Sequence, residues 1–203
     1  IIPSINEISG ETASITLNYV IAMPADDGTY FSCNINEYYR VRITTRGQYL
    51  LNFERKADTV FSSDNDVNAT RITMGIRSDD ALENATTADG RFIYFVSDGN
   101  LWCYNQESRE FTKVFSFGAQ DVDGIRENYD NHHISIMKVE DNGNAVFAVY
   151  GYMNRGTHEG KMGVAVYLFN GVLNTIEEEA FVPYNRSFAT LENDVERLMY
   201  LNS

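Results

Sequence analysis

The sequence lacks several features that would assign it to a class at once. No apolar run approaches the ~20 residues that a membrane-spanning helix needs. No CxxC pair, and no Cys/His pair with suitable spacing, indicates a structural zinc site. Only two cysteines occur, Cys33 and Cys103. The sequence leaves open whether they form a disulfide or remain two buried thiols.

A recognisable leader is also missing. The first residue is not methionine, and neither a basic segment nor a signal-like apolar segment follows Ile1. We therefore expect a processed protein or an excised domain, with any anchor or export signal either removed or never present.

Basic residues are few. The chain has 16 Lys and Arg against 29 Asp and Glu, a net charge of −13. Binding to a nucleic-acid backbone depends mainly on basic side chains that neutralise phosphate, so we expect no nucleic-acid partner. The same balance argues against docking on anionic lipid, and we expect membrane contact only through an anchor outside this segment. The acidic surface favours solubility, with cation binding as the alternative.

Strand signals dominate what is present. With 203 residues, of which 43% are hydrophobic and 22% charged, the chain is long enough for a substantial globular core. Short apolar or alternating runs bounded by Asp, Asn, Ser and Gly predict strands, whereas helical signals are scarce. In the first part of the chain we predict strands over residues 14–23, 30–34, 38–44, 48–54 and 71–77, with one short helix around 57–61.

The second part predicts two sets of strands. The first is a three-strand meander over residues 92–96, 101–105 and 111–117, whose Asp-Gly turn is a strong hairpin signal. The second covers residues 134–139, 145–152, 163–170 and 175–182. We expect residues 197–202, RLMYLN, to begin another strand.

These two sets align as a repeat. LWCYN at residues 101–105 matches VYLFN at 166–170 with a shift of 65 positions, and the same shift carries Phe111 onto Ile176. Residues 92–96 match 146–150 at a shift of 54, which implies an insertion of 11 residues in the second hairpin. That insertion is the glycine-rich loop at residues 153–162.

A four-stranded meander that repeats every ~40–50 residues is typical of a β-propeller blade. We predict an all-β fold of repeated antiparallel four-stranded meanders of blade type. Residues 1–85 would be a β-rich segment, with degenerate blades as one interpretation. Residues 86–203 would hold two propeller-like repeats and the first strand of a further one. Because a closed propeller needs at least four blades, the repeats would belong to a larger or incomplete propeller.

Several stretches resemble one group of proteins. GYMNRGTHEGKMG, YYRVRITTRGQYLLNFER and LWCYNQESREFTKVFSF are similar to uncharacterised extracytoplasmic proteins of gut clostridia, which look like membrane-tethered, β-rich, multi-domain chains. The resemblance implies an extracytoplasmic location, secreted or tethered, and brings no assigned activity.

The glycine-rich loop is the main candidate site. It places Asn154, Arg155, His158 and Glu159 between glycines, and loops on a rigid scaffold often carry function. One interpretation is a plain hairpin loop with Arg155 paired to Glu159, and a second is a ligand or partner site formed by these four residues. A third is a metal site that adds the pair at residues 132–133 and acids such as Asp130, although the HExxH spacing is absent.

Other candidates are weaker. The segments at residues 64–66 and 121–124 faintly resemble calcium loops but fit ordinary turns better. No GxSxG motif occurs, and neither cysteine has a catalytic context. In the run of three acids at residues 177–179, Glu177 and Glu179 share one face of the predicted strand. We expect this to be the solvated face of an outer strand, where the charges discourage edge pairing.

We therefore expect a non-catalytic extracytoplasmic binding or scaffolding module of a larger cell-surface protein, without a cofactor or metal, whose partner is an unknown protein or glycan. The alternative is a glycan or cell-wall hydrolase that uses Glu159 of the same loop.

Overall fold

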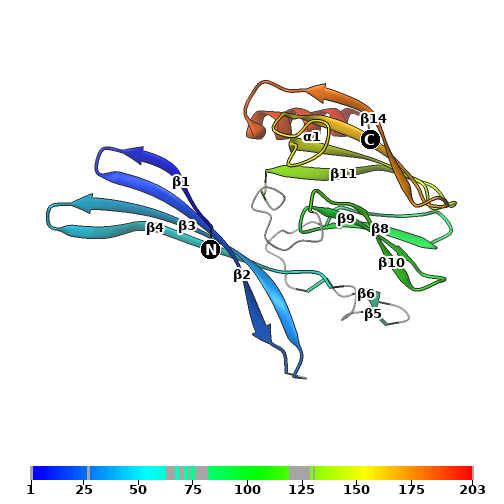
Figure 1. Ribbon diagram of the computed structural model, residues 1–203, viewed down its shortest axis with the longest axis horizontal. Coiled ribbons are helices and arrows are strands. Elements are labelled where there is room, and N and C mark those ends of the chain that lie inside the picture. Colours follow the sequence, from blue (N-terminus) through cyan, green and yellow to red (C-terminus); the bar gives the residue numbers. More distant parts are fainter. Residues whose placement is uncertain are drawn as a thin grey trace. The chain divides into compact units, whose positions relative to one another are not determined.

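The computed structural model describes residues 2–26, 28–62, 67–68, 71–72, 74–75, 82–118, 129 and 131–202. The chain divides into two compact units, residues 1–80 and 81–203, which are described separately. It is mostly β, with three antiparallel four-stranded sheets and a C-terminal helix (Figure 1). Among the residues described, no helix is long and apolar enough to cross a membrane.

The first unit is a meander of unusually long strands. Its order is β1-β2-β3-β4, with a two-stranded ribbon β5-β6 beyond it. The bounds are β1 Ile2–Ser9, β2 Thr12–Pro24, β3 Tyr30–Thr44, β4 Gly47–Thr59, β5 Val67–Asn68 and β6 Arg71–Ile72.

Two predictions for this unit were wrong. The strands predicted at residues 30–34 and 38–44 are one strand, β3, because the alternation continues through buried Ile35, exposed Asn36 and buried Glu37. The helix predicted around 57–61 is instead the end of β4, where Ala57 pairs with Ile35. Cross-strand pairing outweighed local preference there. The strand predicted at 71–77 corresponds to β6, and most of its remainder lies outside the described residues.

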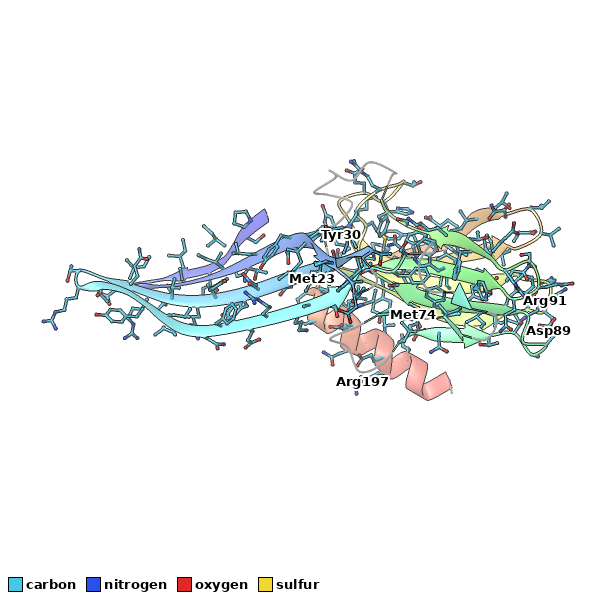
Figure 2. All side chains as sticks on the ribbon, turned by 90° about the horizontal axis from the view of Figure 1, so that it is seen from below. Met23, Tyr30, Met74, Asp89, Arg91 and Arg197 are labelled. Carbon is cyan, nitrogen blue, oxygen red and sulfur yellow. The ribbon has the colours of Figure 1, made fainter. Side chains whose placement is uncertain are left out.

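The first sheet has one apolar and one polar face. Alternate residues such as Ile15, Tyr39 and Phe53 lie in register across β2, β3 and β4 on one face. Residues of the other face form a hydrogen-bonded polar network, in which Asn36 Nδ2 donates to Asn18 Oδ1 over 2.6 Å. Side chains project from both faces along the whole sheet (Figure 2).

An acidic side chain is buried within the apolar face. Glu37 is 3% exposed and accepts hydrogen bonds from Tyr39 Oη over 2.7 Å and from Arg55 Nε over 2.6 Å. These bonds, that from Tyr39 first, hold the pKa of Glu37 below its ordinary value, although desolvation opposes them. The polar residue that interrupted the strand prediction is therefore a structural ion-pair centre.

The second unit holds two shorter meanders. Their orders are β10-β9-β8-β7 and β11-β12-β13-β14. The bounds are β7 Asn84–Thr86, β8 Phe92–Ser97, β9 Asn100–Asn105, β10 Glu110–Phe115, β11 His132–Val139, β12 Ala145–Tyr152, β13 Met162–Asn170 and β14 Thr175–Pro183. β7 pairs with β8 and so belongs to the first of these two sheets.

The backbone confirms the repeat at a shift of 65. Trp102 pairs with Lys113, and Tyr167 pairs with Glu178. Both hairpins have a register irregularity at the equivalent place, between Lys113 and Phe115 and between the partners of Val166 and Tyr167.

The turns of the two hairpins also match. Asn105 Oδ1 accepts bonds from the amides of residues 107 and 108, and Asn170 Oδ1 accepts them from residues 172 and 173. Each turn then has a left-handed residue, Arg109 at φ 60° and Asn174 at φ 53°. Two turns with different sequences thus use the same side-chain bonds to the backbone.

The other half of the repeat alignment needs correction. Phe95 pairs with Trp102, and Phe147 pairs with the equivalent Tyr167, so β8 matches β12 at a shift of 52 rather than 54. With shifts of 65 and 52 on the two sides of the hairpin, the insertion is 13 residues rather than 11. It comprises three additional strand pairs and a longer loop, because β12 and β13 continue to the pair Tyr152–Met162.

The core lies between these two sheets. It is formed by buried side chains of both: Tyr94, Leu101, Cys103, Val114, Phe117, Ile134, Ala145, Phe147, Val149, Met153, Ala165 and Phe169. Tyr94 Oη donates to Gly143 O over 2.6 Å and so links the β7–β10 sheet to the turn between β11 and β12. Arg91, beside Asp89 in Figure 2, donates to Asp141 O in the same turn.

Equivalent residues of the repeat lie on opposite faces. Leu101 and Cys103 belong to the core between the sheets, whereas their equivalents Val166 and Leu168 lie on the outer face of the second sheet. Conversely, Tyr104 lies outside this core, whereas its equivalent Phe169 belongs to it. The two sheets are therefore stacked in the same orientation, front to back.

Helix α1, Phe188–Asn202, replaces the strand predicted at 197–202. Ser187 Oγ accepts a hydrogen bond from the amide of Thr190 over 3.4 Å at the helix start, and Leu191 and Val195, four residues apart, are buried. The helix packs against β12, and Phe188 stacks on His133 of the neighbouring β11. A short apolar run such as RLMYLN is ambiguous by itself, and the upstream helical spacing decides it.

Both cysteines are buried free thiols. Burial raises the pKa of Cys103 to about 11, so this thiol stays protonated at neutral pH.

The front-to-back stacking predicts unequal effects of two similar substitutions. Leu101→Ala empties a fully buried site and should lower the free energy of unfolding by about 2–5 kcal/mol. Leu168→Ala, on the outer face, should cost roughly 1 kcal/mol. Urea denaturation followed by circular dichroism measures both, and equal losses would contradict the assigned orientation.

The buried carboxylate predicts acid sensitivity of the first unit. The folded-state pKa of Glu37 is lowered, so its contribution to stability is complete above the unfolded value of about 4.3 and is lost as the pH falls toward the folded pKa. Glu37→Gln should lower the melting temperature at pH 7 and reduce the difference in melting temperature between pH 7 and pH 3. Glu54→Gln, an exposed carboxylate of the same sheet, is the control, and identical pH profiles for Glu37→Gln and wild type would refute the role.

Candidate functional site

The loop at residues 153–161 joins β12 to β13 and is anchored at its base. Met153 is 1% exposed and is part of the core. Its amide donates to Lys161 O over 2.8 Å, and its carbonyl accepts from the amide of Gly160 over 2.9 Å. Two hydrogen bonds therefore close the loop at its neck.

Gly151, just before the neck, lets the backbone of β12 pass close to the backbone at the start of β11. It has φ 126°, and a Cβ atom at this position would lie 2.4 Å from Asn131 O. Only glycine fits both the backbone conformation and the close approach of β11. Close packing of the backbone thus explains why the glycine-rich sequence has a glycine at this position.

Asn154 lies inside the protein. It is 1% exposed, and its Nδ2 donates to Tyr129 O over 2.9 Å. The structure thus gives Asn154 a positioning role, because its amide holds the loop base to the segment that precedes β11. The sequence showed only that it stands among other polar residues.

Arg155 and Glu159 form an ion pair on the loop surface. Arg155 Nη1 lies 3.3 Å from Glu159 Oε1, and the two side chains are 43% and 36% exposed. This is the pairing that the hairpin-loop interpretation expects. A partner that approaches the loop would meet these two side chains, whose charges are of opposite sign.

His158 is held against β14. Its ring stacks on Phe181 with 3.7 Å between centroids and 7° between planes, and its Nε2 lies 2.7 Å from Glu178 Oε1. A carboxylate only accepts hydrogen bonds, so Nε2 carries the hydrogen. The loop is thereby fixed in its middle as well as at its neck.

Tyr167 completes the group around Glu178. Its hydroxyl donates to Glu178 Oε2 over 3.2 Å. Burial, with the charge of Glu178 as the second cause, raises the pKa of Tyr167 to about 12, so the phenol remains a donor at neutral pH. Glu178 therefore orients one loop residue and one strand residue at once.

The four predicted site residues are brought together only in part. Arg155 and Glu159 share the loop surface, His158 faces β14, and Asn154 is buried. Sequence reasoning named the acids at residues 177–179 but did not connect Glu178 with His158, which lies twenty positions away. The repeat could have found part of this group, because the turn after Asn170 sets Tyr167 opposite Glu178.

The histidines do not converge on a metal site. His132 Nε2 lies 3.2 Å from Gly99 O, and His133 Nε2 lies 2.8 Å from Glu192 Oε1, away from the His158 and Glu178 pair. No group of three or more His, Cys, Asp or Glu side chains that could hold a metal occurs among the described residues. Asp130 and the calcium-like segments at 64–66 and 121–124 lie outside those residues.

No protein-family model, no curated protein and no solved structure matches the chain. The structure itself defines a mostly β protein with repeated four-stranded antiparallel meanders.

The contacts of His158 predict how firmly the loop is held. His158→Ala removes the stacking on Phe181 and the bond to Glu178, and should lower the free energy of loop opening by roughly 1 kcal/mol. The amides of Gly160 and Lys161 should then exchange with deuterium about fivefold faster. Arg155→Gln, which breaks the surface ion pair with Glu159, should change these rates less than twofold. Equal rates in His158→Ala and wild type would show that the neck alone holds the loop.

Proposed function

We propose that this chain is a non-catalytic binding or scaffolding module of a larger extracytoplasmic protein, and that the loop at residues 153–161 is its partner-binding element. The observation that carries the proposal is the anchoring of this loop at its neck and at its middle. A loop that is already ordered loses less conformational entropy on binding, so it suits recognition.

The position of the loop supports the same function. It is part of a 13-residue insertion into a hairpin whose repeat equivalent, between β8 and β9, turns in two residues. Scaffold and insertion are thus separable parts of the second unit, as in other folds where loops on a rigid sheet carry binding residues. The extracytoplasmic location is part of the proposal and rests on the resemblance given in the sequence analysis alone.

We further propose that the two sheets of the second unit are blade-type repeats. Strand order, hairpin register and front-to-back stacking agree with consecutive propeller blades. Helix α1 covers the outer face of β11 and β12, where a following blade would stack. On this side, the helix therefore caps the two stacked sheets, in the way that terminal repeats are often capped.

The binding function is tested with Arg155→Gln/Glu159→Gln. The double variant keeps the shape and net charge of the loop surface and removes its opposite charges. Wild-type protein applied to glycan and peptide arrays should bind specific members of the set, and the double variant should bind the same members at least tenfold more weakly. Thermal unfolding should be unchanged, because the pair is surface-exposed.

The matched control is Lys138→Gln/Glu140→Gln, which removes another exposed ion pair of the second unit. It should bind as wild type does. Retained binding in the Arg155/Glu159 variant would exclude the loop as the site. Turnover of an arrayed glycan that disappears in Glu159→Gln would instead establish the hydrolase alternative.

A further inference from the structure

The two faces of the first sheet differ in charge at one end. The turns between β1 and β2 and between β3 and β4 lie at the same end, because Ile43 N donates to Glu11 O over 2.7 Å (Figure 1). Near this end β3 carries Arg40 and Arg42 on the polar face, and Arg46 lies in the following turn. We call these three residues the arginine cluster.

Among the described residues, no acidic side chain neutralises the arginine cluster. All three side chains are exposed, and none has an ion pair within the part of the chain that the structure describes. Arg55 of the same sheet, in contrast, pairs with Glu37. In a chain of net charge −13, three adjacent uncompensated cations form a local exception.

An open hollow lies beside the cluster. Two of the arginines line it together with hydroxyl-bearing and apolar side chains, and its residues are Arg42, Thr44, Thr45, Arg46, Tyr49, Leu50 and Leu51. Tyr49 is directly opposite Arg42 on β4 and is 49% exposed. A guanidinium beside an exposed tyrosine ring offers charged hydrogen bonds and a stacking surface at one place.

The polar face continues from the cluster toward the middle of the sheet. Arg40, Tyr38 and Asn36 follow one another on β3, about 7 Å apart along the strand. Each has a polar partner on β2, namely Ser14, Thr16 and Asn18. On β4, Tyr38 and Asn36 pair with Glu54 and Lys56. An extended ligand that lies along β3 would meet hydroxyl, phenol and amide groups after the guanidinium groups.

From these observations we propose that the arginine cluster and the polar face beside it bind an anionic oligosaccharide, with carboxylate or sulfate groups on Arg42 and Arg46 and sugar hydroxyl groups on the polar side chains. Guanidinium groups match planar anions in two-point hydrogen bonds. The proposal concerns the first unit only and is independent of the loop at residues 153–161.

A lipid bilayer fits this end less well. The exposed aliphatic side chains Ile8 and Ile43, at 71% and 54%, lie on the apolar face, opposite to Arg40 and Arg42. A flat membrane would therefore touch either the arginines or the aliphatic groups. A ligand on the polar face touches the arginines and the amide and hydroxyl side chains together.

The experiment measures binding of the whole 203-residue chain to fluorescent octasaccharides by anisotropy. The probes are a carboxylated oligogalacturonate and a sulfated heparin octasaccharide, and their comparison identifies the anion. Wild-type protein should bind at least one of them, more weakly as salt is raised. Arg42→Gln/Arg46→Gln should lose about tenfold or more in affinity, since a single charged hydrogen bond is worth about that factor. Arg40→Gln should lose less.

The control variant, Lys113→Gln/Lys161→Gln, removes the same charge from exposed positions of the second unit and should lose less than twofold in affinity. An equal loss in the control would show general attraction and overturn the site. Absence of wild-type binding at millimolar octasaccharide would also overturn it. The assignment to glycan fails if a single-stranded DNA oligonucleotide or phosphatidylserine vesicles bind as tightly and respond to the same arginine substitutions.

Discussion

The packing of the two repeated sheets against each other determines most of the structure of the second unit. Tyr94 and Leu101 of one sheet meet Phe147 and Ala165 of the other with almost no exposed surface. Because equivalent residues use opposite faces, the pattern of burial of one sheet cannot be copied to the next. This explains why the repeat is strong in backbone register and weak in residue identity.

The insertion loop depends on that packing. Met153 enters the core between the sheets and so fixes the start of the loop. The stacked pair of His158 and Phe181 then holds its middle on the outer strand. The surface that the loop presents is therefore determined by apolar contacts beneath it, and polar residues that are adjacent in the sequence have different environments. Asn154 is buried, whereas the next residue, Arg155, is exposed.

The features that could be predicted were those with local causes. Turn residues fixed the hairpin at Asn105 and its equivalent at Asn170, and the 65-residue shift followed from them. Features set by distant partners could not be predicted. The continuity of β3 depends on the pairing of Glu37 with Arg55, and the orientation of His158 depends on Glu178. The helix at residues 188–202 had a readable signal in the spacing of Leu191 and Val195, but its last residues were read as a strand.

Every four-stranded sheet of this protein pairs its strands in the order in which the chain presents them. Strand pairing within each sheet therefore joins only segments that follow one another along the chain. Each sheet can complete its hydrogen bonds as soon as its fourth strand is available, without waiting for a later segment. Such an order suits a chain that emerges gradually from a ribosome or an export channel, because few strand edges wait unpaired while synthesis proceeds.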